Sequence, residues 1–159
     1  MEKQSKKYIL NILKSKLRKE KNNKTENSNQ LLPIVTVPSD LIVAIFYYLG
    51  PEFRFSSNLL KINNAFYNLA QERRFKPIFN EIIFDTSKGY PYTETIQYAI
   101  NRMEKADLLN CTGPYLDKYH VSSKYFESHE SSIENIFLHK EKNLLKKAAA
   151  KFITYINKD

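Results

Sequence analysis

The apolar run at residues 41–49 is the longest in the chain and constrains the fold more than any other feature. Nine residues are too few for a helix to cross a bilayer, so this segment belongs in a protein core. Ser39 before the run is typical of a helix N-cap, and Gly50-Pro51 after it supplies a stop signal. We therefore predict a central buried helix over residues 40–49. Because the run contains β-branched residues, a buried strand is the alternative.

Two more amphipathic helices are predicted further along the chain. Ser56, Ser57 or Asn58 can cap the first, which runs to about Arg73, and Thr93 can cap the second, which runs to about residue 106. Between them we expect a short strand or extended segment at residues 82–84 and a turn at residues 87–91. The inward-facing residues recur at helical spacing in both helices. They are Leu59, Ile62, Phe66 and Leu69 in the first, and Ile96, Ala99, Ile100 and Met103 in the second.

A β-hairpin and a long helix are predicted to complete the chain. Residues 108–112 and 116–121 flank Gly113-Pro114, and strand alternation places Tyr119 and Val121 on one face. From Ser131 a single helix is predicted to Asn157, longer than so small a domain. Its apolar stripe must be buried on some surface, and packing on its own domain is one alternative. The stripe comprises Ile133, Phe137, Leu144, Ala148, Phe152 and Tyr155.

Most of the positive charge is concentrated at the N-terminus. Residues 1–24 hold nine Lys/Arg and two Glu, a net charge of +7, whereas residues 25–159 hold sixteen Lys/Arg and fifteen Asp/Glu, a net charge of +1. Residues 6–20 show the spacing of an amphipathic helix, and residues 22–30 form a polar linker. This arm is expected to bind a phosphate backbone, an anionic membrane or an acidic protein, or to be a solvated tail. Its basic face comprises Lys3, Lys7, Lys14, Arg18 and Lys21.

The order of three helices and then a hairpin resembles that of a winged helix-turn-helix domain. Within residues 89–123, the resemblance rests on the Tyr-Pro-Tyr-Thr cap at 90–93, the amphipathic helix, the leucine pair at 108–109, and a hairpin that ends in Tyr-His-Val-Ser at 119–122. It covers about residues 39–123 and implies a mainly α (α+β) fold whose hairpin is the wing. The expected organisation is a basic arm and linker (1–30), a winged-helix domain (31–123), and a C-terminal helix for dimerisation or docking (124–159).

This resemblance implies a non-enzymatic, DNA-binding transcriptional regulator whose third helix lies in the major groove. Gln97 and Asn101 would then pair with adenine and Arg102 with guanine, while Lys105 and Lys118 would contact phosphates. Gln97, Asn101 and Arg102 can also be simple solvated helix residues. A second function class is an accessory subunit that docks on other proteins, for example in a bacterial defence-type assembly. The near-neutral domain and the apolar last helix favour that alternative.

Catalytic and metal-binding residue types form no recognisable motif in this sequence. His120, His129 and His139 lack metal-ligand spacing, and the single cysteine, Cys111, is predicted to be a small buried apolar residue. The three glycines do not form a phosphate-binding loop. We therefore expect no enzymatic activity, no metal and no cofactor. No leader-like apolar segment follows the basic residues at the start, so a cytoplasmic protein is expected.

Overall fold

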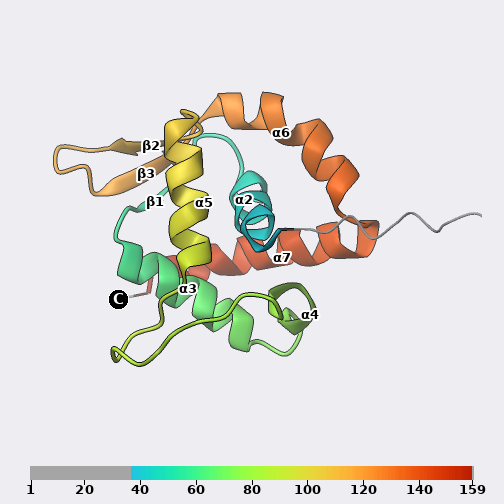
Figure 1. Cartoon of the computed structure of the whole chain (residues 1–159). Coiled ribbons are helices and arrows are strands. Elements are labelled where there is room, and N and C mark those ends of the chain that lie inside the picture. Colours follow the sequence, from blue (N-terminus) through green and yellow to red (C-terminus); the bar gives the residue numbers. More distant parts are fainter. Residues whose placement is uncertain (1–36, 159) are drawn as a thin grey trace, which may run out of the picture. The chain divides into compact units, whose positions relative to one another are not determined.

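Figure 1 shows the fold of the computed structural model, which describes residues 37–158 apart from the side chains of residues 128–132. The helices are α2 (Pro38–Tyr48), α3 (Leu59–Gln71), α4 (Lys76–Phe79), α5 (Glu94–Lys105), α6 (Ser123–Ile136) and α7 (His139–Ile156). The strands are β1 (Arg54–Ser56), β2 (Leu109–Thr112) and β3 (Lys118–Val121). The fold is therefore mainly helical with a small antiparallel sheet, which confirms the predicted α+β class. The predicted arm helix and polar linker lie outside the described residues.

Helix α2 runs through the core, as the apolar run predicted, and the alternative of a buried strand is wrong. Ile42, Ala44, Ile45 and Phe46 are fully buried. The predicted cap is also wrong, because the helix begins one residue before Ser39, at Pro38. Proline suits the first helical position, since its φ is fixed and it has no N–H to leave unpaired. Ser39 is instead buried in the first turn, where its hydroxyl has no hydrogen-bond partner among the described residues.

The three strands form one antiparallel sheet in the order β1-β3-β2. Strands β2 and β3 are the predicted hairpin, whereas β1 was not predicted, because three residues are too few to show a strand pattern. In the register, Tyr119 lies opposite Phe55 and Val121 lies opposite Leu109, and these four side chains are buried. Because side chains alternate along a strand, Lys118 and His120 lie on the other face of β3.

Residues 82–84 were expected to form a short strand or an extended segment, and they form no strand in the connection between α3 and α5. This connection begins with the short helix α4, whose proline occupies an early helical position, and an isolated bridge then pairs Asp85 with Tyr92. The predicted turn lies inside this bridge, where the carboxylate of Asp85 accepts the N–H of Ser87 at 2.8 Å. That hydrogen bond also lowers the pKa of Asp85. The connection is thus a closed loop that leads the chain back to the start of α5.

One buried side chain joins α3 to the start of α5. The amide oxygen of Asn63 accepts the N–H of Thr93 at 3.0 Å, and its amide nitrogen donates to the carbonyl of Leu59 at 2.9 Å. Asn63 and Thr93 are both buried. Because Thr93 is the N-cap of α5, this contact fixes the point at which that helix begins.

Replacement of Asn63 by alanine should destabilise the protein by about 1–3 kcal/mol, because the N–H of Thr93 would remain buried without a partner. The matched control is Asn64→Ala, which removes the same side chain from an exposed position on the same helix. Its expected effect is within about 0.5 kcal/mol. Urea unfolding followed by circular dichroism measures both changes. Equal midpoints for the two variants would contradict the anchoring role of Asn63.

Four phenylalanines from separate elements form the centre of the core. The ring centroid of Phe152 on α7 lies 4.9 Å from that of Phe66 on α3, and 5.7 Å from those of Phe46 on α2 and Phe55 on β1. All four side chains are buried. The sheet, the two earlier helices and the last helix therefore share one hydrophobic core.

The prediction of one long helix from Ser131 to Asn157 is wrong, because the chain leaves the helical conformation between α6 and α7. Phe137 and Leu138 have extended backbones that separate the two helices. Glu141 accepts the N–H of Leu138 at 2.8 Å, and Lys142 donates to the carboxylate of Glu134 at 2.5 Å across the bend. The bend turns α7 onto α2 and α3, where it packs along both helices (Figure 1).

The stripe that was expected to face a partner is largely covered by the chain itself. Ile133, Phe137, Ala148 and Phe152 are buried, while Leu144 and Tyr155 pack against the core and are partly exposed. Tyr155 also donates to the carboxylate of Glu72 at 2.6 Å, beyond the end of α3. Packing on the chain's own domain therefore accounts for the stripe without a partner. None of the described helices has the length and apolar character needed to span a membrane.

Candidate functional site

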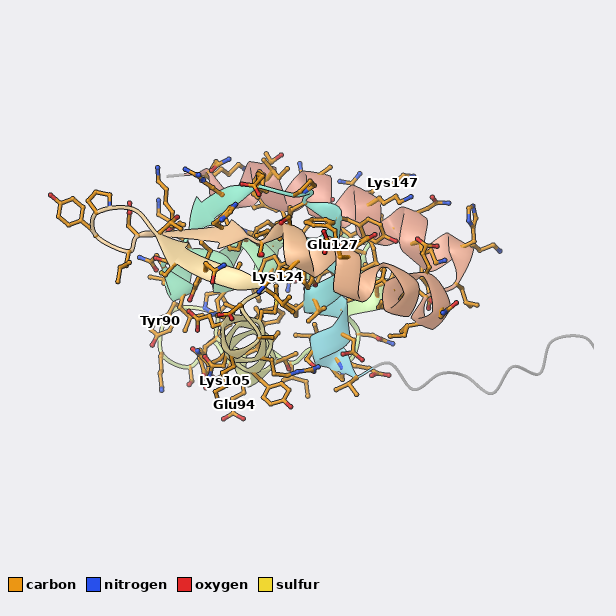
Figure 2. The ribbon with its side chains drawn as sticks, turned by 90° about the horizontal axis from the view of Figure 1, so that it is seen from above. Tyr90, Glu94, Lys105, Lys124, Glu127 and Lys147 are labelled. Carbon is orange, nitrogen blue, oxygen red and sulfur yellow. The ribbon has the colours of Figure 1, made fainter. Side chains whose placement is uncertain are left out.

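The outward face of α5 is the candidate site that the sequence predicted. The hydroxyl of Thr93 caps the helix by accepting the N–H of Thr95, and the predicted inward residues Ile96, Ala99, Ile100 and Met103 are buried. On the opposite face, Glu94, Tyr98, Asn101, Arg102 and Lys105 are exposed, and Gln97 is half-buried. Figure 2 shows Glu94 and Lys105 pointing away from the molecule on the same side. Helical spacing therefore identified the exposed side chains of this face correctly.

Two amides on this face are hydrogen-bonded to each other. The Nε2 atom of Gln97 donates to the Oδ1 atom of Asn101, one turn further along, at 2.9 Å. This bond uses one lone pair of Asn101 and leaves its second lone pair and both amide hydrogens available. The pair therefore presents an oriented donor and acceptor to solvent, which is the combination needed to pair with the edge of a base.

Arg102 is held only loosely on this face. Its guanidinium carbon lies 5.6 Å from the centre of the Tyr98 ring, and Nη1 lies 3.8 Å from Oδ1 of Asp40 on α2. The second distance exceeds that of a hydrogen bond, and both side chains are partly exposed. Such an ion pair contributes about 0–1 kcal/mol, so little free energy is needed to redirect Arg102 toward a ligand.

Charges of both signs are mixed on the α5 face. Arg102 and Lys105 are balanced by Glu94 and Glu104. Glu104 accepts a hydrogen bond at 2.9 Å from the hydroxyl of Tyr119, which connects α5 to the sheet. Burial, together with this bond and the carboxylate charge, raises the pKa of Tyr119, so the tyrosine stays protonated as a donor. Helix α5 as a whole therefore has no net charge, and its outward face is polar.

Lys118, the hairpin residue predicted to contact a phosphate, lies away from the outward face of α5. Tyr119 reaches Glu104 of α5, so its neighbour Lys118 points to the other side of β3. Strand alternation predicts this position of Lys118, because it places Tyr119 and Val121 on one face and Lys118 on the opposite face. The basic arm residues Lys3, Lys7, Lys14, Arg18 and Lys21 lie outside the described residues.

The histidines and the cysteine do not form a reactive cluster within the described part of the chain. His120 contacts the carboxylate of Glu52 at 2.7 Å, and His139 contacts the amide of Asn143 at 3.3 Å. Cys111 is exposed, contrary to the prediction that it is buried, because it lies on the outer strand β2 near the hairpin turn. Its thiol donates to the carbonyl of Leu116 at 3.0 Å. Among the described residues no group of acidic, histidine or cysteine side chains could hold a metal ion.

A second basic surface, on α7, was not predicted. Lys140, Lys146, Lys147 and Lys158 are exposed along this segment, whereas Glu141 is the single acidic residue of α7 itself. Figure 2 shows Lys147 on the opposite side of the molecule from Glu94 and Lys105. The spacing of the lysines predicts this surface once α7 is treated as a separate helix that begins after the break at Phe137 and Leu138.

No family model, curated protein or solved structure matches the chain. The functional assignment therefore depends on the arrangement of the described residues and on their chemistry.

Proposed function

We propose that this chain is a non-enzymatic winged-helix protein that binds duplex DNA through the outward face of α5. The order of the elements, with α2, α3 and α5 followed by the β2–β3 hairpin, supports this assignment. The observation that carries the proposal is the oriented amide pair of Gln97 and Asn101 beside the loosely held Arg102. The long connection between α3 and α5 departs from a compact helix-turn-helix turn, so the proposal relies on the α5 face alone.

In this proposal α5 enters the major groove and its side chains contact base edges. Asn101 pairs with adenine through its amide hydrogens and the second lone pair of Oδ1, while Arg102 leaves Asp40 and pairs with guanine. A bidentate contact of this kind discriminates against the wrong base by about 1–3 kcal/mol, which exceeds the value of the exposed ion pair with Asp40. Lys105 contacts a phosphate and adds affinity without sequence preference. Because α5 has no net charge, the basic arm would supply much of the electrostatic attraction.

Duplex selection with the full chain, followed by titration at several salt concentrations, tests this proposal. Asn101→Ala should remove the preference at one base pair, a loss of about 5–150-fold. Lys105→Ala should weaken binding to all duplexes alike and reduce the salt slope by about one. The control is Asn143→Ala, which removes an exposed amide from the basic surface of α7. If the full chain selects no duplex, or if Asn143→Ala weakens binding as much as Asn101→Ala, the proposal is wrong.

Docking on a partner protein is the second candidate function, because large apolar side chains are exposed at the α5 face and at the hairpin turn. Tyr98 is 57% exposed, and Tyr115 and Leu116 are 87% and 62% exposed. The turn is well anchored, since the carbonyl of Leu116 accepts hydrogen bonds from Ser57 and Cys111. Exposed tyrosines are enriched in protein interfaces. A chain that selects no duplex but binds a partner protein, and loses that binding with Tyr115→Ser, would favour this function.

A further inference from the structure

A cavity of about 320 Å³ lies between α2, α5 and α6, beside the proposed DNA-binding face. Its walls include Val43 of α2, Met103 of α5, and Ile133 and Ile136 of α6. This volume is within the range of small-molecule sites, which are mostly apolar with a few polar groups that orient the ligand. The cavity is therefore large enough for a compact apolar molecule.

Asp40 and Arg102 are the charged residues that line this cavity. Their charged atoms lie 3.8 Å apart, too far for a hydrogen bond, so each group keeps hydrogen-bonding capacity for a third molecule. The cavity thus combines an apolar space with one negative and one positive group at neighbouring points of its lining.

This combination of charges selects the class of ligand. A simple carboxylate that pairs with Arg102 would place its negative charge close to Asp40, and a simple amine that pairs with Asp40 would lie close to Arg102. At this distance and exposure a like charge opposes binding by about as much as an exposed ion pair gains, roughly 0–1 kcal/mol, and the analogue also forgoes the charged hydrogen bond to the second group. A molecule that carries both charges avoids this repulsion, because its ammonium faces Asp40 and its carboxylate faces Arg102.

We infer that the cavity binds an apolar α-amino acid, with the ammonium on Asp40, the carboxylate on Arg102 and the side chain among Met103, Ile133 and Ile136. The volume lies near the lower end of the range for small-molecule sites, so the cavity suits a small molecule. Leucine, isoleucine and methionine are of this size. The ligand bridges α5 and α6, because residues of both helices line the cavity.

Binding of the amino acid also has a consequence for DNA binding, which rests on the proposed function. Arg102 serves both sites, so an arginine that is paired with a bound carboxylate is no longer free to contact guanine. The amino acid and the duplex therefore weaken each other's binding by the same factor. This coupling makes the protein a sensor of amino-acid supply.

Isothermal titration of the full chain without DNA tests the ligand site separately from DNA binding. The probes are L-leucine, isocaproate, which lacks the ammonium, and isoamylamine, which lacks the carboxylate. L-Leucine should bind saturably, and each analogue should bind at least 10-fold more weakly. Asp40→Asn should weaken L-leucine binding by about 10–100-fold, the loss expected for a hydrogen bond to a charged group.

Two further variants keep the test decisive. Ala106→Leu should block L-leucine binding, because it adds volume at an exposed position that lines the cavity. Glu127→Gln, which changes an exposed residue of α6 outside the cavity lining, should leave L-leucine binding unchanged. No saturable binding of L-leucine, L-isoleucine or L-methionine would overturn the inference. Equal binding of isocaproate and L-leucine, or normal binding to Asp40→Asn, would also overturn it. Failure of the proposed function would appear only in the duplex titrations.

Discussion

Phe152→Ala should destabilise the protein by about 3–5 kcal/mol, the range measured when a buried phenylalanine is truncated to alanine. The ring of Phe152 is fully buried and contacts phenylalanines from α2, β1 and α3. Its removal leaves a cavity at the point where four elements meet, and rigid secondary structure around it can collapse only in part. Single domains have a free energy of unfolding of about 5–15 kcal/mol, so this one substitution removes a large share of that free energy.

The control for Phe152→Ala is Thr154→Ala, two residues further along the same helix at an exposed position. Its expected effect is within about 0.5 kcal/mol, because it changes no buried contact. Urea unfolding of the two variants, followed by tyrosine fluorescence, measures the difference. An unfolding midpoint for Phe152→Ala as high as that of Thr154→Ala would show that α7 does not pack on the core.

Local signals in the sequence were sufficient for α5 and for the hairpin. Thr93 at the N-cap and the spacing of Ile96, Ile100 and Met103 specified both the start and the inward face of α5. At the hairpin, Gly113 adopts φ +93°, a backbone conformation that strongly favours glycine. Such elements are predictable because the residues that determine them lie close together in the chain.

The bend between α6 and α7 could not be predicted, because no glycine or proline marks it. Half of a capping box is present, with Glu141 three residues after Leu138. Leucine at the N-cap has no side-chain acceptor, however, so the usual sequence signature is incomplete. The bend depends on tertiary packing, which buries Phe137 before it and Leu145 after it in one core.

Part of the candidate site was predictable, because the residues that define the outward face of α5 lie close together in the chain. Helical spacing identified the exposed residues of α5, including Asn101 and Arg102. Helical spacing could not predict contacts between distant segments. One such contact joins Arg102 to Asp40, which lie 62 positions apart in the sequence. These contacts decide which side chains are free to bind and where the cavity lies.

A chain that ends at Leu138 should fail to fold cooperatively, because α7 supplies part of the core. Leu145, Phe152 and Ile156 are buried by contact with the rest of the domain. Burial of each such side chain contributes about 1.5–3 kcal/mol, so their loss removes roughly 5–9 kcal/mol. That is comparable with the whole stability of a domain of this size. A dimerisation helix, by contrast, could be removed and leave a folded monomer.

Thermal unfolding and amide NMR dispersion of the shortened chain distinguish these two roles of α7. The control is a chain that ends at Ile156, which retains every buried residue of α7 and should unfold at the temperature of the full chain. Light scattering of the full chain separately measures whether the protein is a monomer or a dimer. If α7 is a core element, the midpoint of unfolding does not depend on protein concentration, whereas a folded interface between two copies would raise the midpoint with concentration. Cooperative unfolding of the chain that ends at Leu138 would contradict the core role of α7 and would favour a partner-binding helix.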